Sequence, residues 1–149
     1  MNAELLLIGN ASYHQPKLDQ LARKIPQLVV KAYLNYKTVL TLQKSVSVNI
    51  ILESKAEISP FLPGKFPHCI AAERPILLLG PVRSESRRLL GEDYPYWARS
   101  EDEKEIEQNL KKLYQSWKLR HGNWKMEQES LKEYLSAAHL KNEIEQLLD

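Results

Sequence analysis

Short apolar runs alternate with amphipathic helical patterns over the first hundred residues, and this alternation restricts the fold more than any other feature of the chain. The runs, such as Glu4–Ile8 and Val48–Leu52, contain almost no alternating polar residues. Strands that are buried on both faces have this character. Helical stripes separate the runs, with Leu18, Leu21 and Ile25 at the spacing of one helix face. The pattern predicts an α/β fold in which helices cover both faces of a parallel sheet.

We place the expected strands at Glu4–Ile8, Leu28–Lys31, Val48–Leu52, 76–79 and Tyr94–Ala98. Two of the intervening helices are expected at 65–73 and 83–90. Another helix is expected between the first two strands, with Pro16 in its first turn and Pro26 after its end. A further helix, between the second and third strands, can be capped by Asn35.

The last fifty residues are different in character, because helical patterns continue there without further strands. Ser100 and Glu103 form a capping box, which predicts a helix from this point to about residue 119. A break at 121–123 precedes a final helix, expected at about 127–148. The chain is thus expected to form one domain, 1–149, with an α/β core at 1–99 and C-terminal helices at 100–149. The final helix has more apolar residues than a small sheet needs, which indicates a second docking surface.

Composition excludes several classes of function. The net charge of +2, from 21 basic and 19 acidic residues, is too balanced for a protein that binds nucleic acid through bulk electrostatics. The cluster of Arg83, Arg87 and Arg88 is interrupted by Glu85, and is expected to be a solvated helix face. No apolar run is long enough to cross a bilayer, and no signal peptide is visible. The single cysteine, Cys69, cannot form an internal disulfide, which favours a reducing compartment and a cytoplasmic location.

Catalytic groups are not evident. The four histidines share no metal-ligand spacing, and no Ser/His/Asp set is apparent. The sequence therefore gives no support to metal or nucleophilic catalysis, and no cofactor is expected.

The stretch SPFLPGKFPHCIAAERPILLLG, residues 59–80, has the order of an anion-binding segment: a turn, a lysine, a helix start and a buried strand. Unpaired N–H groups at a helix start attract anions. Gly64 lets the backbone approach a ligand closely, and Lys65 adds a full positive charge. Pro67 fits only in the first turn of a helix, so it places the helix start near Lys65.

The pieces ELLLIG, SVNIILE, LPGKFPHCIAAERPILLLGP and NLKKLYQSW, in this order, resemble the C-terminal, donor-binding domain of GT-B glycosyltransferases. The resemblance covers residues 4 to about 118. It implies a Rossmann-like fold and binding of a nucleotide-diphosphate sugar of the UDP or GDP type, for transfer to a glycan or lipid acceptor in polysaccharide biosynthesis. The nucleotide-sugar-binding residues that it implies are Gly9, Tyr33, Glu57, Ser59, Phe61, Gly64 and Lys65.

Three of these residues also have plainer interpretations. Glu57 can be a solvated loop residue, Lys65 a helix-start lysine in water, and Tyr33 a surface tyrosine. Retaining members of the family often have a second glutamate where Lys65 stands, so the resemblance does not extend to recognition of the ribose by a carboxylate.

Relative to the family, the chain is expected to lack the acceptor domain and the first strand and helix of the donor domain. Such a chain is expected to be inactive by itself, because transfer requires the donor to be held against an acceptor in a closed cleft. If the gap left by the missing strand closes, a sheet of about five strands in the order 2-1-3-4-5 results. Glu4–Ile8 would then pair with both Leu28–Lys31 and Val48–Leu52.

Two other interpretations remain open. The chain can be a non-catalytic α/β module with a vestigial donor site, whose final helix docks a partner protein, a second copy or the missing acceptor domain. A flavodoxin-like cofactor domain or a phospho-receiver domain fits the architecture alone. The loop GNASYHQP lacks the phosphate-binding run and the acidic cluster that these last two classes need.

Overall fold

The computed structural model describes residues 3–126 and 128–148. Its internal contacts divide the chain into two compact units, Met1–Thr41 (unit 1) and Leu42–Asp149 (unit 2). The division falls within helix α2 (Tyr36–Ser45), far from the expected subdivision at residue 99. The C-terminal helices belong to the same unit as most of the α/β core.

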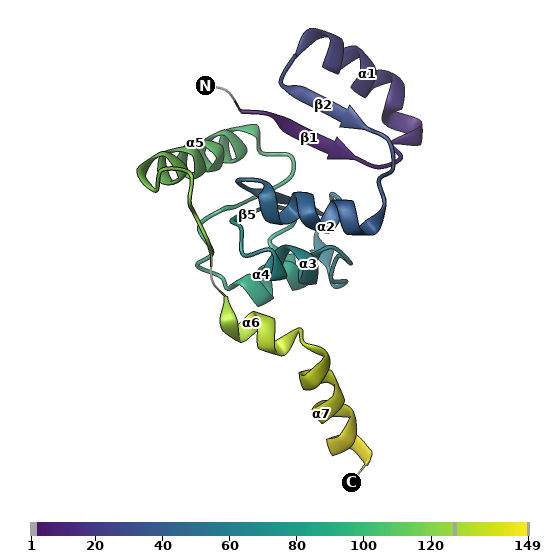
Figure 1. Ribbon diagram of the computed structural model, residues 1–149, viewed down its shortest axis with the longest axis vertical. Helices are drawn as coiled ribbons and strands as arrows, with labels where there is room; N and C mark the ends of the chain where they lie inside the picture. The colour runs from purple at the N-terminus through teal and green to yellow at the C-terminus, as the bar shows by residue number, and fades with distance from the viewer. Residues whose placement is uncertain (1–2, 127, 149) are drawn as a thin grey trace. The chain divides into compact units, whose positions relative to one another are not determined.

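Unit 1 is one parallel β–α–β element (Figure 1). Strand β1 (Leu5–Ile8) pairs with β2 (Leu28–Lys31) in parallel, from Leu5 opposite Leu28 to Ile8 opposite Lys31. A short 3-10 turn, η1 (Ser12–His14), and helix α1 (Gln15–Lys24) connect them. The proline expected in the first turn of α1 is there, and the helix ends before Pro26 as predicted.

Unit 2 contains a second parallel sheet, in the order β3–β5–β7. Asn49 lies opposite Ile76 and Leu52 opposite Leu79, while Leu79 lies opposite Ala98 on the other side. The elements of unit 2 are β3 (Asn49–Leu52), β4 (Ile58–Ser59), α3 (Phe66–Ala71), β5 (Ile76–Leu79), β6 (Arg83–Ser84), α4 (Glu85–Leu90), β7 (Trp97–Ala98), α5 (Glu103–Leu119), α6 (Glu129–Tyr134) and α7 (Ala137–Leu148).

The expected single sheet of about five strands is wrong. The fold is α/β with parallel strands, but within residues 3–126 and 128–148 the strands form sheets of two, three and two members. Strand β1 pairs with β2 as predicted, whereas the described ladders pair β3 with β5 and not with β1. Runs without polar alternation reveal that a strand is buried but not which edge it pairs with, so the pattern could not specify this neighbour.

The last strand is shorter than expected, because Tyr94 folds inward before the ladder begins. The N–H of Tyr94 donates to the carbonyl of Gly91 in a turn. Its buried hydroxyl donates to the Ile76 carbonyl at 2.7 Å and accepts from the Ile76 N–H at 3.2 Å. The side chain therefore anchors the start of β5, and pairing starts only at Trp97.

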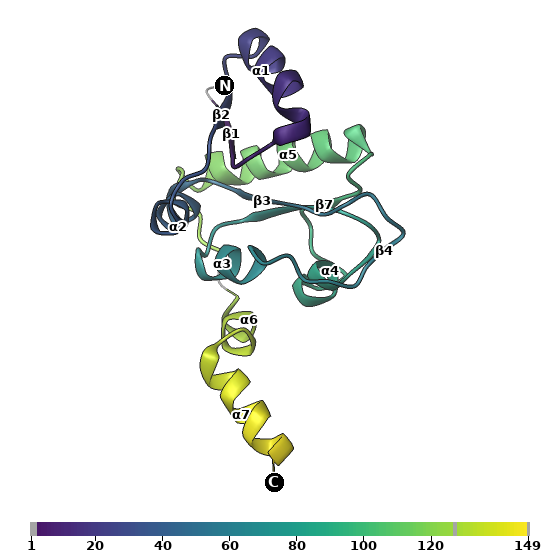
Figure 2. The ribbon, with the colours of Figure 1, turned by 90° about the vertical axis from the view of Figure 1, so that its right-hand side faces the viewer.

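The core lies on both faces of the β3–β5–β7 sheet. One cluster joins Ile51 and Leu78 to Phe66, Cys69 and Ile70 of α3. The other places Leu77 against Leu113 of α5 and against Trp124. Figure 2 shows α5 on one side of this sheet and α3 and α4 on the other. The two covered faces explain why the strands have almost no polar alternation.

The C-terminal helices differ from the expectation in two places. Helix α5 is capped by Asp102, whose side chain accepts from the N–H groups of Lys104 and Glu105, and not by Ser100. The expected helix at 127–148 is two helices, α6 and α7, with Ser136 capping the second through the N–H of His139. Residue 127 lies outside the described residues.

Every described helix is too short or too polar to span a bilayer.

Candidate functional site

The loops that follow β3 and β5 are held together at the carboxyl edge of the sheet. After β3 the chain runs to β4, and after β5 it runs to β6. These two short strands pair in parallel, with Ile58 opposite Arg83 and Ser59 opposite Ser84. Ligands of parallel α/β sheets bind outside the carboxyl ends of the strands. The β4–β6 pair, which the sequence did not reveal, therefore joins the two loops best placed to form a site.

A buried glutamate, Glu53, lies where the first of these loops leaves β3. Glu53 follows the last residue of β3, is 6% exposed, and accepts a hydrogen bond of 2.7 Å from the Ser86 hydroxyl through Oε1. Its Oε2 is buried and has no hydrogen-bond partner among the described residues. A methyl group added to Gly80, which directly follows β5, would lie 2.5 Å from this oxygen and would overpack the site. The carboxylate thus ties the end of β3 to the first turn of α4.

Sequence reasoning missed Glu53 and Ser86. One signal was available, since an acidic residue directly after a buried strand stands at the carboxyl edge of a parallel sheet. Ser86 had no comparable signal, because its role depends on how α4 packs.

The Pro63–Lys65 turn leads into α3 as predicted. Lys65 is the N-cap of this helix, and Pro67 lies in its first turn. The Phe66 N–H donates to the Pro63 carbonyl at 2.8 Å, and proline has no N–H to offer. The first turn of α3 therefore offers an anion fewer donors than a helix start without this turn. The exposed Lys65 side chain and the Gly64 backbone, with open space where a side chain would stand, are the accessible parts.

The three other predicted residues of this unit occupy the loop between β3 and α3. Glu57 is exposed and directly precedes β4, Ser59 is half-buried within β4, and Phe61 is 82% exposed. Together with Gly64 and Lys65 they form a continuous segment of the chain on the carboxyl side of β3. An exposed phenylalanine in such a loop offers an aromatic face to a planar ligand.

Gly9 and Tyr33 belong to unit 1, at the carboxyl edge of the β1–β2 sheet. Gly9 directly follows β1, has φ +134°, and donates its N–H to the Lys31 carbonyl at 3.1 Å. This backbone conformation favours glycine. Tyr33 follows β2 and is 80% exposed. The seven predicted residues therefore fall into two groups, each at the carboxyl edge of its own sheet.

Cys69 is part of the core, as the sequence indicated. The side chain is 1% exposed, and Gln43 Nε2 contacts its sulfur at 3.5 Å. Burial raises the pKa of the Cys69 thiol to about 11, an effect that nearby Lys65 and Gln43 only partly oppose. A thiol with so high a pKa is a poor nucleophile at neutral pH.

The arginine cluster separates into distinct structural contacts. Arg88 makes a bidentate pair with Glu85, with contacts of 2.6 and 2.8 Å, and this pair lowers the pKa of the Glu85 carboxyl. Arg87 lies over the ring of Trp97, 3.9 Å from its centroid, and donates to the Val82 carbonyl. Arg88 is exposed, as expected of a solvated helix face, whereas Arg87 is half-buried against Trp97 and Arg83 lies in β6, before the helix.

Neither a metal centre nor a known relative defines this site further. The described residues contain no group of three or more His, Cys, Asp or Glu side chains that could hold a metal ion. No protein-family model, curated protein or solved structure matches the chain.

Proposed function

We propose that the chain is the nucleotide-sugar-binding part of a glycosyltransferase. The observation that carries the proposal is the carboxyl edge of the β3–β5–β7 sheet, where the β4–β6 pair holds two loops together. The first of these loops contains Glu57, Ser59, Phe61, Gly64 and Lys65.

The chemistry of the donor fits this edge. A nucleotide-diphosphate sugar presents a dianionic diphosphate between a planar base and a sugar. The Lys65 ammonium can pair with the diphosphate, and the open backbone at Gly64 permits close approach. In the transition state the same contacts stabilise the nucleotide diphosphate as it departs. We assign no catalytic residue, and we expect no transfer by these residues alone.

Lys65→Glu tests the proposal. Titration of the 15N-labelled chain with UDP and GDP should shift the amide resonances of residues 57–66 at millimolar ligand. Lys65→Glu places a negative charge beside the diphosphate, and should weaken binding at least tenfold, which corresponds to roughly 1.4 kcal/mol. Lys112→Glu is the matched control, because it reverses an exposed lysine of α5, on the other side of the sheet.

Two results would contradict the proposal. One is the absence of shifts at 57–66 at millimolar ligand in the unchanged chain. The other is equal affinity in the Lys65→Glu and Lys112→Glu variants, which would make Lys65 a solvated helix-start residue.

A second candidate is a non-catalytic module that docks another protein. The apolar residues of α7 favour it: Leu140, Ile144, Leu147 and Leu148 are 48–85% exposed. An absence of nucleotide binding together with self-association or partner binding would support this candidate over the first.

Both candidates are compatible with a cytoplasmic location, in solution or at a membrane surface, because Cys69 is the only cysteine and is buried.

A further inference from the structure

Helix α7 has a seam of exposed apolar residues along one face. Ala137, Leu140, Ile144 and Leu147 follow one another at intervals of three, four and three residues. This spacing is that of the a and d positions of helices that pack against another helix. Leu140 is 61%, Ile144 48% and Leu147 85% exposed. In Figures 1 and 2, α7 extends past α6 and away from the β3–β5–β7 sheet.

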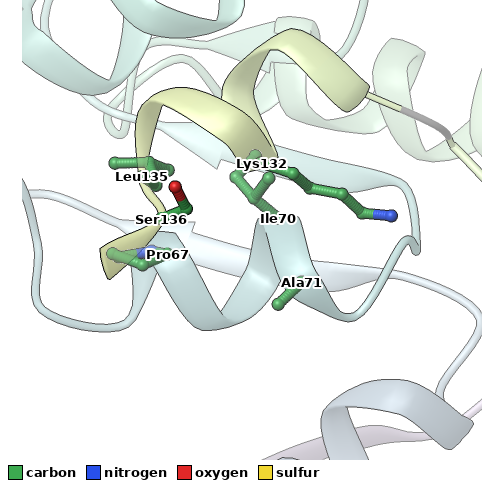
Figure 3. A pocket seen from close by; sticks show the side chains of 6 residues that line it. All are labelled: Pro67, Ile70, Ala71, Lys132, Leu135 and Ser136. Atoms are coloured by element: carbon green, nitrogen blue, oxygen red, sulfur yellow. The ribbon is translucent and has the colours of Figure 1, made fainter. Parts of the chain in front are cut away.

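A hollow lies at the amino end of this seam. It has a volume of about 360 Å³ and is walled mainly by apolar groups of α3 and of the end of α6 (Figure 3). The residues that line it are Pro67, Ile70, Ala71, Lys132, Leu135 and Ser136. Ser136 is one helical turn before Leu140, whose N–H donates to the Ser136 carbonyl at 3.2 Å. The hollow and the seam therefore adjoin.

We propose that α7 pairs in antiparallel orientation with α7 of a second copy of this chain. The 12 residues of α7 span about 18 Å. An antiparallel copy of equal length sets its Leu147 and Leu148 beside Ala137 and Ser136, at the hollow. The seam of each helix is then covered, and each hollow receives the leucines that end the other helix. A two-fold axis makes the two contacts identical, as in most homodimers.

The charges also favour this orientation. The last turn of α7 has no basic residue, and its second half includes Glu143 and Glu145. The carboxyl end of a helix is the negative end of its dipole. The antiparallel arrangement sets this acidic half beside the amino-terminal half of the other α7, which includes Lys141 and the positive end of the helix dipole. A parallel pair would instead place the two negative ends together and leave both hollows open.

The polar residues of α7 argue against a membrane as the occupant of the seam. Helices that lie on anionic membranes have lysine and arginine on their polar side. Here Lys141 is outnumbered by Glu143 and Glu145, and it pairs with Glu145 at 3.6 Å. A second helix with the same apolar spacing is the occupant that fits both the seam and the charges.

Sedimentation of the full chain tests the pairing. Over micromolar to millimolar concentrations, the weight-average mass should rise from the 17.3 kDa of one chain toward twice that value. Ile144→Glu buries a charge in the seam and should raise the dimer dissociation constant at least tenfold, about 1.4 kcal/mol. Asn142→Glu adds the same charge to α7 outside the seam and should leave the dimer unchanged. Circular dichroism verifies that both variants stay folded.

Cysteine cross-linking tests the relative orientation of the two α7 helices without introducing charged residues. A mixture of the Ala137→Cys and Leu147→Cys chains should form a disulfide-linked dimer, while Ala137→Cys alone should not, and Cys69 stays out of the reaction because it is buried. Cross-linking of Ala137→Cys with itself in preference to Leu147→Cys would overturn the antiparallel orientation.

In the sedimentation experiment, a constant monomer mass would overturn the pairing. Equal dissociation constants for the Ile144→Glu and Asn142→Glu variants would do the same. Neither measurement involves a nucleotide, so the outcome is independent of donor binding.

Discussion

At the scale of single residues, the closest packing at the candidate site is between Gly80 and Glu53. A Cβ at Gly80 would meet Glu53 Oε2 at 2.5 Å and Glu53 Cβ at 3.0 Å. The glutamate cannot swing away without cost, because its Oε1 holds the Ser86 hydroxyl and its side chain is buried. Gly64 is the opposite case, since the space around it is open. Gly80 is therefore needed for close packing against Glu53, whereas Gly64 leaves the backbone open to a ligand.

Gly80→Ala should lower the free energy of unfolding by about 1–3 kcal/mol, because the added methyl group overpacks a site that is already filled. Urea denaturation followed by circular dichroism measures the change. Gly64→Ala is the control and should change the free energy of unfolding by less than about 0.5 kcal/mol. Equal effects of the two substitutions would show that the Glu53 contact does not restrict position 80.

At the scale of elements, capping and ion pairs fix the helices that flank the sheet. Asp102 begins α5 by accepting two backbone N–H groups, at 3.1 and 3.0 Å. Glu73, which follows α3 and has φ +54°, pairs with Lys132 of α6 and, at 3.7 Å, with Lys125. These pairs connect the end of α3 to α6. Leu131 of α6 and Leu135, which directly follows the helix, pack against the core.

Asp102→Ala should lower the free energy of unfolding by about 1 kcal/mol, because it removes the acceptor for two N–H groups of the first turn. Ser100→Ala should have little effect, although the sequence pattern gave Ser100 the capping role. Thermal unfolding of both variants compares the two positions. A larger loss for Ser100→Ala would restore the capping box expected from the sequence.

Acid should weaken the connection between α3 and α6. The hydrogen bond from Lys132 is the main cause that lowers the pKa of Glu73, and it also raises the pKa of Lys132. A lowered carboxyl pKa stabilises the folded chain above the ordinary value of about 4.3, and this stability is lost as pH falls through the folded-state pKa. Urea midpoints measured between pH 6 and 3 should fall less steeply in Glu73→Gln than in the unchanged chain. Parallel curves would show that these ion pairs contribute nothing measurable.

The sequence predicted most elements, but few of the contacts between them. Periodicity located β2 and β5 at their observed bounds, and Pro67 located the start of α3. The pairing of β3 and the short β4–β6 ladder depend on how distant segments pack, which local patterns do not encode. The same holds for the contact of Glu53 with Ser86. The turn at Pro63–Lys65 could be predicted because turn chemistry is local. The assignment of Glu57, Ser59, Phe61, Gly64 and Lys65 to a nucleotide-sugar site stays a prediction.

At the scale of the whole molecule, burial is unequal between the two units. The fully buried side chains among the described residues, such as Ile51, Phe66 and Leu78, lie in unit 2. In unit 1 the residues of β1 and β2 are half-buried or exposed. Segments with few buried contacts open at lower free energy than a packed core. Unit 1 is therefore expected to exchange its backbone amide hydrogens before unit 2 does.

The burial of Cys69 makes the chain its own reporter of unfolding. A fluorogenic maleimide reacts with thiolates, and this thiol is both shielded from the reagent and held protonated by its raised pKa of about 11. Labelling should proceed only when α3 separates from the sheet. The labelling rate of Cys69 in native buffer therefore measures how often the core opens. Since no other cysteine is present, the signal has a single source. The substitutions discussed above that add no cysteine can be ranked in this way without denaturant and without an added probe site.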